Sequence, residues 1–197
     1  MVTLKEIEKT NDVNSLRRIS KQEGLSFGFP LYKVLVEHKY GIELDFDVYL
    51  ESKGFNLQRP YVWTEHQQEE LIWSMLYGRY IPPVTFVCCD VNDGSRMGKQ
   101  IYKVIDGKQR LMTIRRYMMN EFPIYMDDGR KVYWDDLDDA AKYQISNRCK
   151  ILYSIYHSYT DTPITDDEMI IIFNFYNFTG TPQEQNHKSK LLKALNK

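Results

Sequence analysis

The segment Tyr102-Lys103-Val104-Ile105-Asp106-Gly107-Lys108-Gln109-Arg110 decides the fold of this chain. Residues 101–106 have the apolar, β-branched composition of a strand, and residues 109–119 place apolar side chains along one face of a helix. Gly107 stands between the two runs, where a glycine lets the backbone turn tightly. The segment therefore predicts a strand that passes through a glycine turn directly into a helix.

The start of that helix is a predicted anion site. A helix start leaves several backbone N–H groups unpaired and carries partial positive charge. Lys108 and Arg110 add full positive charge, and an arginine fork can hold two phosphate oxygens at once. Asp106 could hold a metal ion or orient a water molecule, and Gln109 could orient a water molecule or a ribose. The alternative is an aspartate that caps the helix beside a solvated lysine and arginine.

Local signals in both directions from this segment predict a series of short elements. Thr64 and Gln67 form a capping-box pattern at the start of a helix, and Gly78 suits its end. Asp128-Gly129 between two apolar runs predicts a hairpin. The other expected elements are short helices within 1–24, strands over 41–50, 84–89 and 151–156, a helix over 135–146, a helix opened by a Thr165 and Glu168 capping box, and a last helix over about 181–195.

This mixture of elements predicts an α+β fold, with a small mixed sheet and surrounding helices. The expected division is an N-terminal helical extension over residues 1–40 and a main domain over residues 41–197. With 197 residues the chain is long enough to bury a substantial core.

Composition and charge limit the classes of function. Hydrophobic residues make up 43% and charged residues 27%, as is ordinary for a soluble globular protein. The formal net charge of −1 argues against a broad basic surface, so contact with DNA must be local or made through one nucleotide. Three cysteines, two of them adjacent, argue against a disulfide framework. Because no apolar run reaches membrane-spanning length and the first residues are no signal peptide, we expect a cytoplasmic protein without a membrane partner.

A second group of candidate residues precedes the first capped helix. Gln58 and Arg59 could reach the same ligand as the central segment. Tyr61 and Trp63 could form a wall on which a base stacks. Packing in the core is the favoured interpretation of these two aromatic side chains, with Trp63 as the hydrophobic residue that precedes the N-cap.

A third group lies near the carboxyl end, where Gly180 marks a bend between two predicted helices. Asn177 and Thr179 could present polar groups to a ligand, and His187 could act as a general base or a phosphate donor. A surface position is the favoured interpretation of His187. The sequence has no Walker-type phosphate loop, no dinucleotide-binding glycine pattern and no nucleophile elbow, and its four histidines lack metal-binding spacing.

Four stretches in this order resemble the motifs of one family. They are Gln58-Arg59-Pro60-Tyr61-Val62-Trp63, residues 71–76 with Ile81-Pro82-Pro83, residues 104–113 with their Asp-Gly-Lys-Gln-Arg core, and Asn177-Phe178-Thr179-Gly180-Thr181-Pro182. The set resembles the N-terminal domain of GmrSD-type modification-dependent restriction enzymes, a branch of the ParB/sulfiredoxin-like superfamily, over roughly residues 42–195. The central family motif is Asp-Gly-Gln-Gln-Arg, so Lys108 stands where the family usually has Gln.

The resemblance implies a ParB-like fold, a nucleoside-triphosphate site with Mg²⁺ or another divalent metal, and DNA cleavage as the usual outcome. By position, Asp106, Gln109 and Arg110 would be catalytic, and Asp106 would also be the metal ligand. The implied nucleotide-binding set is Gln58, Arg59, Gly107, Lys108, Arg110, Asn177 and Thr179.

Two hypotheses about activity follow from the resemblance, with an enzyme as the leading one. The enzyme would be a metal-assisted phosphohydrolase that cleaves a nucleoside triphosphate or a DNA phosphodiester. The alternative is a module without turnover: a nucleotide-gated switch that recruits a DNA-acting partner, or an interaction protein that inhibits one. Full-length family proteins carry a second nuclease domain with a His-Asn-His motif, which the four histidines here do not supply. Compact single-domain versions resemble those of tailed phages, which implies action in phage–host conflict in the host cytoplasm.

Overall fold

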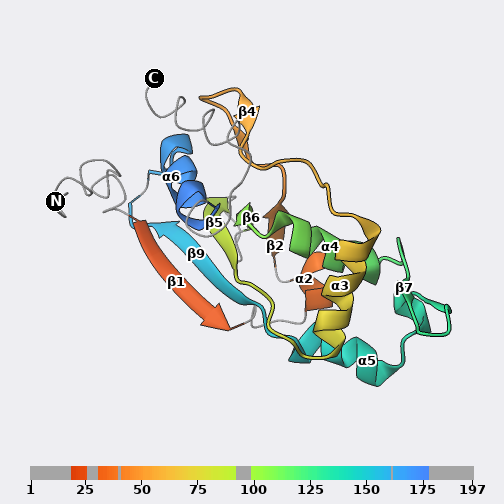
Figure 1. Cartoon of the computed structure of the whole chain (residues 1–197). Helices are drawn as coiled ribbons and strands as arrows, with labels where there is room; N and C mark the ends of the chain where they lie inside the picture. Colours follow the sequence, from red (N-terminus) through yellow and green to blue (C-terminus); the bar gives the residue numbers. More distant parts are fainter. Residues whose placement is uncertain (1–18, 26–30, 40, 92–98, 161, 178–197) are drawn as a thin grey trace, which may run out of the picture.

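A five-stranded mixed sheet forms the centre of the computed structural model, which describes residues 19–25, 31–39, 41–91, 99–160 and 162–177. The strands lie in the order β1 (Ile19–Leu25), β9 (Leu152–Ser158), β5 (Val84–Val91), β6 (Lys99–Asp106) and β2 (Ile42–Asp45) (Figure 1). β5 and β6 are antiparallel, whereas β2 runs parallel to β6 and β9 runs parallel to β5. Because β2 and β6 are parallel, their carboxyl ends lie at the same edge of the sheet.

Helices cover both faces of this sheet (Figure 1). One face packs against α2 (Leu31–Leu35), α3 (Glu65–Leu76) and α4 (Lys108–Met118), and the other packs against α6 (Asp166–Asn177). Val104 and Ile105 are neighbours on β6 and are both fully buried, yet they belong to different cores. β6 is therefore a central strand, buried on both faces, that carries the predicted segment into α4.

Smaller elements complete the fold. β3 (Tyr49–Leu50) pairs with β4 (Phe55–Asn56), and β7 (Ile124–Tyr125) pairs with β8 (Lys131–Val132) in the hairpin predicted around Asp128-Gly129. The 3-10 helix η2 (Trp134–Asp136), α5 (Asp139–Tyr143) and the π-helix η3 (Gln144–Arg148) follow one another after the hairpin. No helix in the described ranges is long and apolar enough to cross a membrane.

The α+β class with a mixed sheet is confirmed, and so are both capping boxes that lie among the described residues. Thr64 and Gln67 exchange the two bonds of a capping box at the start of α3, and Thr165 and Glu168 do so at the start of α6. The third box and the helix predicted over 181–195 lie outside the described residues.

Three expectations are corrected. The short helices predicted within 1–24 are wrong for residues 19–24, which belong to β1 because their backbone pairs along β9. The helix predicted over 135–146 is divided, because the Asp138 side chain accepts the Ala141 N–H and starts a new helix there. The strand predicted over 41–50 ends at Asp45, whose carboxylate accepts the Asp47 N–H and turns the chain. The boundary expected at residue 40 stays a prediction.

Candidate functional site

The junction of β6 and α4 has the predicted strand–glycine–helix geometry. Gly107 has a φ of 101°, in the left-handed region, and stands between the last residue of β6 and the first residue of α4. A Cβ atom at this position would lie 2.4 Å from Cγ1 of the fully buried Val84, so both the conformation and the space require glycine. No side chain caps the start of α4, and its first turn contains no acidic residue. The N-terminal end of α4 therefore keeps the features of an anion site.

Arg110 ties the end of β6 to the start of β5. Its Nη2 donates to Oδ2 of Asp106 at 2.8 Å and to the carbonyl oxygen of Pro83 at 2.8 Å. Both side chains of the ion pair are largely buried, with 17% of Arg110 and 28% of Asp106 exposed. The buried Nε of Arg110 has no hydrogen-bond partner among the described residues. Since an arginine carries five N–H donors, the guanidinium keeps capacity for a further acceptor.

Lys108 is buried and pairs with a carboxylate that sequence reasoning missed. Only 5% of Lys108 is exposed, and its Nζ lies 2.7 Å from Oδ1 of Asp47. Asp47 belongs to the loop that follows β2, which reaches the junction because β2 and β6 end at the same edge of the sheet. The signal in the sequence was weak, because 61 residues separate the partners and Asp47 lay within a predicted strand.

Residues 58–62, which we term the strap, are fastened to β6 and α4 by two glutamine side chains. The Gln58 amide donates to the carbonyl oxygens of Val104 and Ile105 at 2.8 and 2.5 Å. Gln109 accepts the Val62 N–H at 2.9 Å and donates to the Pro60 carbonyl oxygen at 3.0 Å. Both ends of the Gln109 amide are thus engaged within the protein, and its predicted role towards a water molecule or ribose stays a prediction.

Tyr61 adds a side-chain contact between the strap and α4. Its hydroxyl lies 2.6 Å from Oγ1 of Thr113, and the Arg116 guanidinium lies over its ring at 5.0 Å from the centroid. The Glu121 carboxylate, together with Tyr61, raises the pKa of Arg116 above its usual value, against the opposing effect of burial. Trp63 packs against the core, as expected. Tyr61 therefore connects the strap to α4 in this structure, and its ring is not an open surface on which a base could stack.

The structure brings most of the predicted residues to one junction. Gln58, Asp106, Gly107, Lys108, Gln109 and Arg110 meet there through the contacts above. Arg59 is exposed on the strap. Asn177 is the last residue of α6, which covers the other face of the sheet, and the description does not extend to its side chain. Thr179 and His187 lie outside the described residues.

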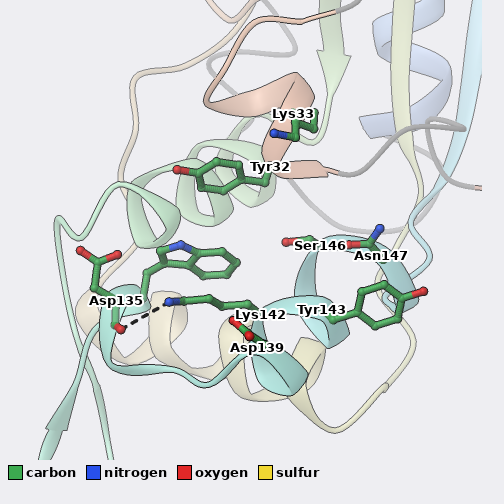
Figure 2. A pocket seen from close by; sticks show the side chains of 9 residues that line it. Tyr32, Lys33, Asp135, Asp139, Lys142, Tyr143, Ser146 and Asn147 are labelled. Carbon is green, nitrogen blue, oxygen red and sulfur yellow. Dashed lines mark hydrogen bonds between the residues drawn. The ribbon is translucent and has the colours of Figure 1, made fainter.

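A separate hollow of about 520 Å³ lies between α2, η2, α5 and η3. One of its sides is a stacked pair, Tyr32 and Trp134, with ring centroids 5.6 Å apart. Figure 2 shows Tyr32 and Asp135 on one side of this hollow and Tyr143 and Asn147 on the other. None of the predicted nucleotide-binding or catalytic residues that the structure describes lines it.

The carboxylate at the junction fits a metal ion that is bound together with phosphate groups better than an ion held by protein side chains alone. Within the described part of the chain, no three or more His, Cys, Asp or Glu side chains are grouped to hold a metal ion. Mg²⁺ in nucleotide sites is commonly held by one or two carboxylates together with substrate phosphates. Asp106 therefore suits an ion that arrives with phosphate groups, and not a resident ion held by protein side chains alone.

Comparison with known proteins identifies the family of this chain. Residues 56–195 match the family described as the GmrSD restriction endonuclease, N-terminal domain. The match begins just before the strap and includes the whole of the β6–α4 junction. Searches of curated proteins and of solved structures gave no match. Because the match spans well over half of the chain, the protein belongs to the family of GmrSD restriction endonuclease N-terminal domains, and its role is related to that of restriction endonucleases.

Proposed function

We propose that the protein binds a nucleoside triphosphate at the β6–α4 junction and is a metal-assisted phosphohydrolase or DNA endonuclease. The observation that carries the proposal is the uncapped start of α4 at the carboxyl end of a central strand, with Lys108 and Arg110 in its first turn. The aligned N–H groups and the two cations together favour a polyanionic ligand. Membership of a restriction endonuclease family supports DNA as the downstream target.

Each residue at the junction has a proposed part in binding. Arg110 holds phosphate oxygens through donors that Asp106 and Pro83 do not use, and Lys108 contributes a point charge. Gly107 lets the ligand approach the backbone closely. Gln58 and Arg59 lie on the strap beside the junction, and Asn177, the last residue of α6, and Thr179 are the further proposed ligands.

Asp106 is the proposed protein ligand of a divalent ion. Such an ion, when bound with the phosphates, would neutralise charge that develops on the phosphate oxygens. Arg110 already orients the Asp106 carboxylate through Oδ2. Asp106→Asn should abolish turnover while leaving metal-free nucleotide binding intact or tighter, because a repulsive carboxylate is replaced by a neutral amide.

Calorimetric titration of nucleoside triphosphates into wild type and Arg110→Ala tests the site. Loss of a charge-assisted contact typically costs ~1.5–3 kcal/mol, so affinity should fall roughly ten- to a hundredfold. Arg148→Ala is the matched control, because Arg148 is an exposed arginine in η3 that stacks on Tyr143. Thermal denaturation of each variant separates loss of binding from loss of folding. Equal affinity in wild type and Arg110→Ala would remove the start of α4 as the binding site.

A second candidate function is a nucleotide-gated module that recruits or inhibits a DNA-acting partner without turnover. It is favoured by the pairing of both cations with carboxylates of the same chain, Lys108 with Asp47 and Arg110 with Asp106. Phosphate release and DNA cleavage, measured with Mg²⁺ and with and without DNA, distinguish the two functions. Binding without either product would select the module.

A further inference from the structure

We propose that Asp47 is an internal competitor for the anion site: its carboxylate occupies Lys108 until a phosphate group displaces it. Asp47 thereby sets the affinity of the site. This inference rests on the proposed function and names a regulating residue that lies outside the span of the family match and outside the family motifs.

The proposal begins with the unequal burial of the two partners. Only 6% of the Lys108 side chain is exposed, whereas 77% of the Asp47 side chain is exposed. A buried ammonium needs a partner, because removing an unpaired charge from water is costly. An exposed carboxylate has no such need, since water can solvate it when it leaves. A phosphate group can therefore replace the Asp47 carboxylate as the partner of Lys108, provided that the ammonium always has one anionic partner.

The backbone around Asp47 is fixed, so the exchange needs only a side-chain rotation. Its own N–H donates to Oδ1 of Asp45 at 2.9 Å. Val48, the next residue, is fully buried, and its carbonyl oxygen accepts the Leu57 N–H at 2.8 Å. The loop is thus held on both sides of Asp47 while the carboxylate itself projects into solvent over the Lys108 ammonium.

The neighbouring pair of Asp106 and Arg110 is not built for the same exchange. Both of its side chains are largely buried, and Arg110 is held in addition by the Pro83 carbonyl oxygen. Of the two cations in the first turn of α4, Lys108 is therefore the one whose counter-charge can be replaced from solvent. Lys108, which stands where the family usually has Gln, is thus paired with a carboxylate of the same chain, that of Asp47.

A double-mutant cycle with inorganic tripolyphosphate as the probe tests this inference. The probe carries the anion without a base, and its affinity is measured by calorimetry at low salt for wild type, Asp47→Asn, Lys108→Gln and the double variant. Asp47→Asn should tighten binding by roughly two- to fivefold, because the Asp47 carboxylate is exposed and water weakens its attraction to the ammonium. In the Lys108→Gln background the same change should have no effect, because the competition needs the ammonium.

Asp45→Asn is the matched control, because it removes the same charge two residues away, at the end of β2, and keeps an oxygen that can accept the Asp47 N–H. A gain equal to that of Asp47→Asn, or a gain that persists without Lys108, would show general repulsion and overturn the inference while leaving the proposed function intact. If the wild type binds tripolyphosphate and Asp47→Asn leaves that affinity unchanged, the inference is likewise overturned and the proposed function stays intact. Absence of binding in wild type and Asp47→Asn alike would overturn the proposed function and this inference together.

Lysine acetylation gives a readout that needs no ligand. If Asp47 covers the Lys108 ammonium, Asp47→Ala, which shortens the side chain, should raise the acetylation of Lys108, measured by mass spectrometry, while the exposed Lys150 stays unchanged. Equal labelling of Lys108 in wild type and variant would contradict the contact on which the competition depends.

Discussion

The long helices of this domain begin in two different ways. α3 and α6 satisfy their own starts, because Thr64 with Gln67 and Thr165 with Glu168 each exchange a pair of hydrogen bonds. α4 begins instead at Gly107, with no capping side chain. A capping box completes the hydrogen bonding of a helix start within four residues, whereas an uncapped start leaves N–H groups for partners from elsewhere. The difference separates the two helix starts that are closed by their own side chains from the one that lies at the candidate site.

The largest expected effect is at Gly107 itself. Gly107→Ala should destabilise the protein by ~2–4 kcal/mol, because an added Cβ combines left-handed backbone strain with a clash against Val84. Chemical denaturation measures the loss. Gly129→Ala is the control for strain alone, since Gly129 has a φ of 81° and no atom within 4 Å of the added Cβ. Equal losses at the two glycines would mean that the contact with Val84 is unimportant.

The next effect concerns the strap. Gln109→Leu leaves the Val62 N–H and the Pro60 carbonyl without their partner and should cost ~1–3 kcal/mol. The freed strap should also be cut faster by chymotrypsin after Tyr61, whose following residue is Val62. Gln144→Leu is the control, because it removes a single bond of 3.3 Å to Met75. Unchanged cleavage after Tyr61 would show that the strap is held by its other contacts without Gln109.

The smallest effects are expected at the two capping boxes. Thr64→Ala and Thr165→Ala should each cost ~0.5–2 kcal/mol, and Thr165→Ala should cost more because Glu168 is buried. Neither change should alter the affinity for nucleoside triphosphate once folding is intact. A cap variant that weakens binding as much as Arg110→Ala would break the distinction between the two kinds of helix start.

Local hydrogen bonding explains how much of the fold could be predicted. The capping boxes, the hairpin and the turn at Gly107 depend on residues at most eight positions apart, so their signals stand in the sequence. β1 escaped prediction because Ser20-Lys21-Gln22-Glu23 has no apolar alternation, and its backbone is paired by β9 far along the chain. The helix expected over 135–146 failed because Asp138 caps the following turn.

The sequence predicted which residues make up the candidate site, but it did not predict which residues they contact. The residues that gather at the junction were named from the sequence, yet their partners were not, because they come from other segments. Asp47 joins Lys108 from the end of β2, and the Pro83 carbonyl oxygen joins Arg110 from the start of β5. Periodicity and motif spacing report which residues share an element, whereas these contacts depend on which strands are neighbours.

The position of β1 in the sheet has a consequence for synthesis on the ribosome. Among the strands that the structure describes, β1 is made first, yet its sheet neighbour is β9, which is made last. While β2, β5 and β6 assemble with α3 and α4, β1 waits with unpaired backbone groups, a state in which apolar strands aggregate. Its polar run, Ser20-Lys21-Gln22-Glu23, opposes that aggregation. The polar residues of β1, whose lack of apolar alternation prevented its prediction as a strand, thus oppose aggregation of the nascent chain until Ser158 has emerged to pair with Ile19.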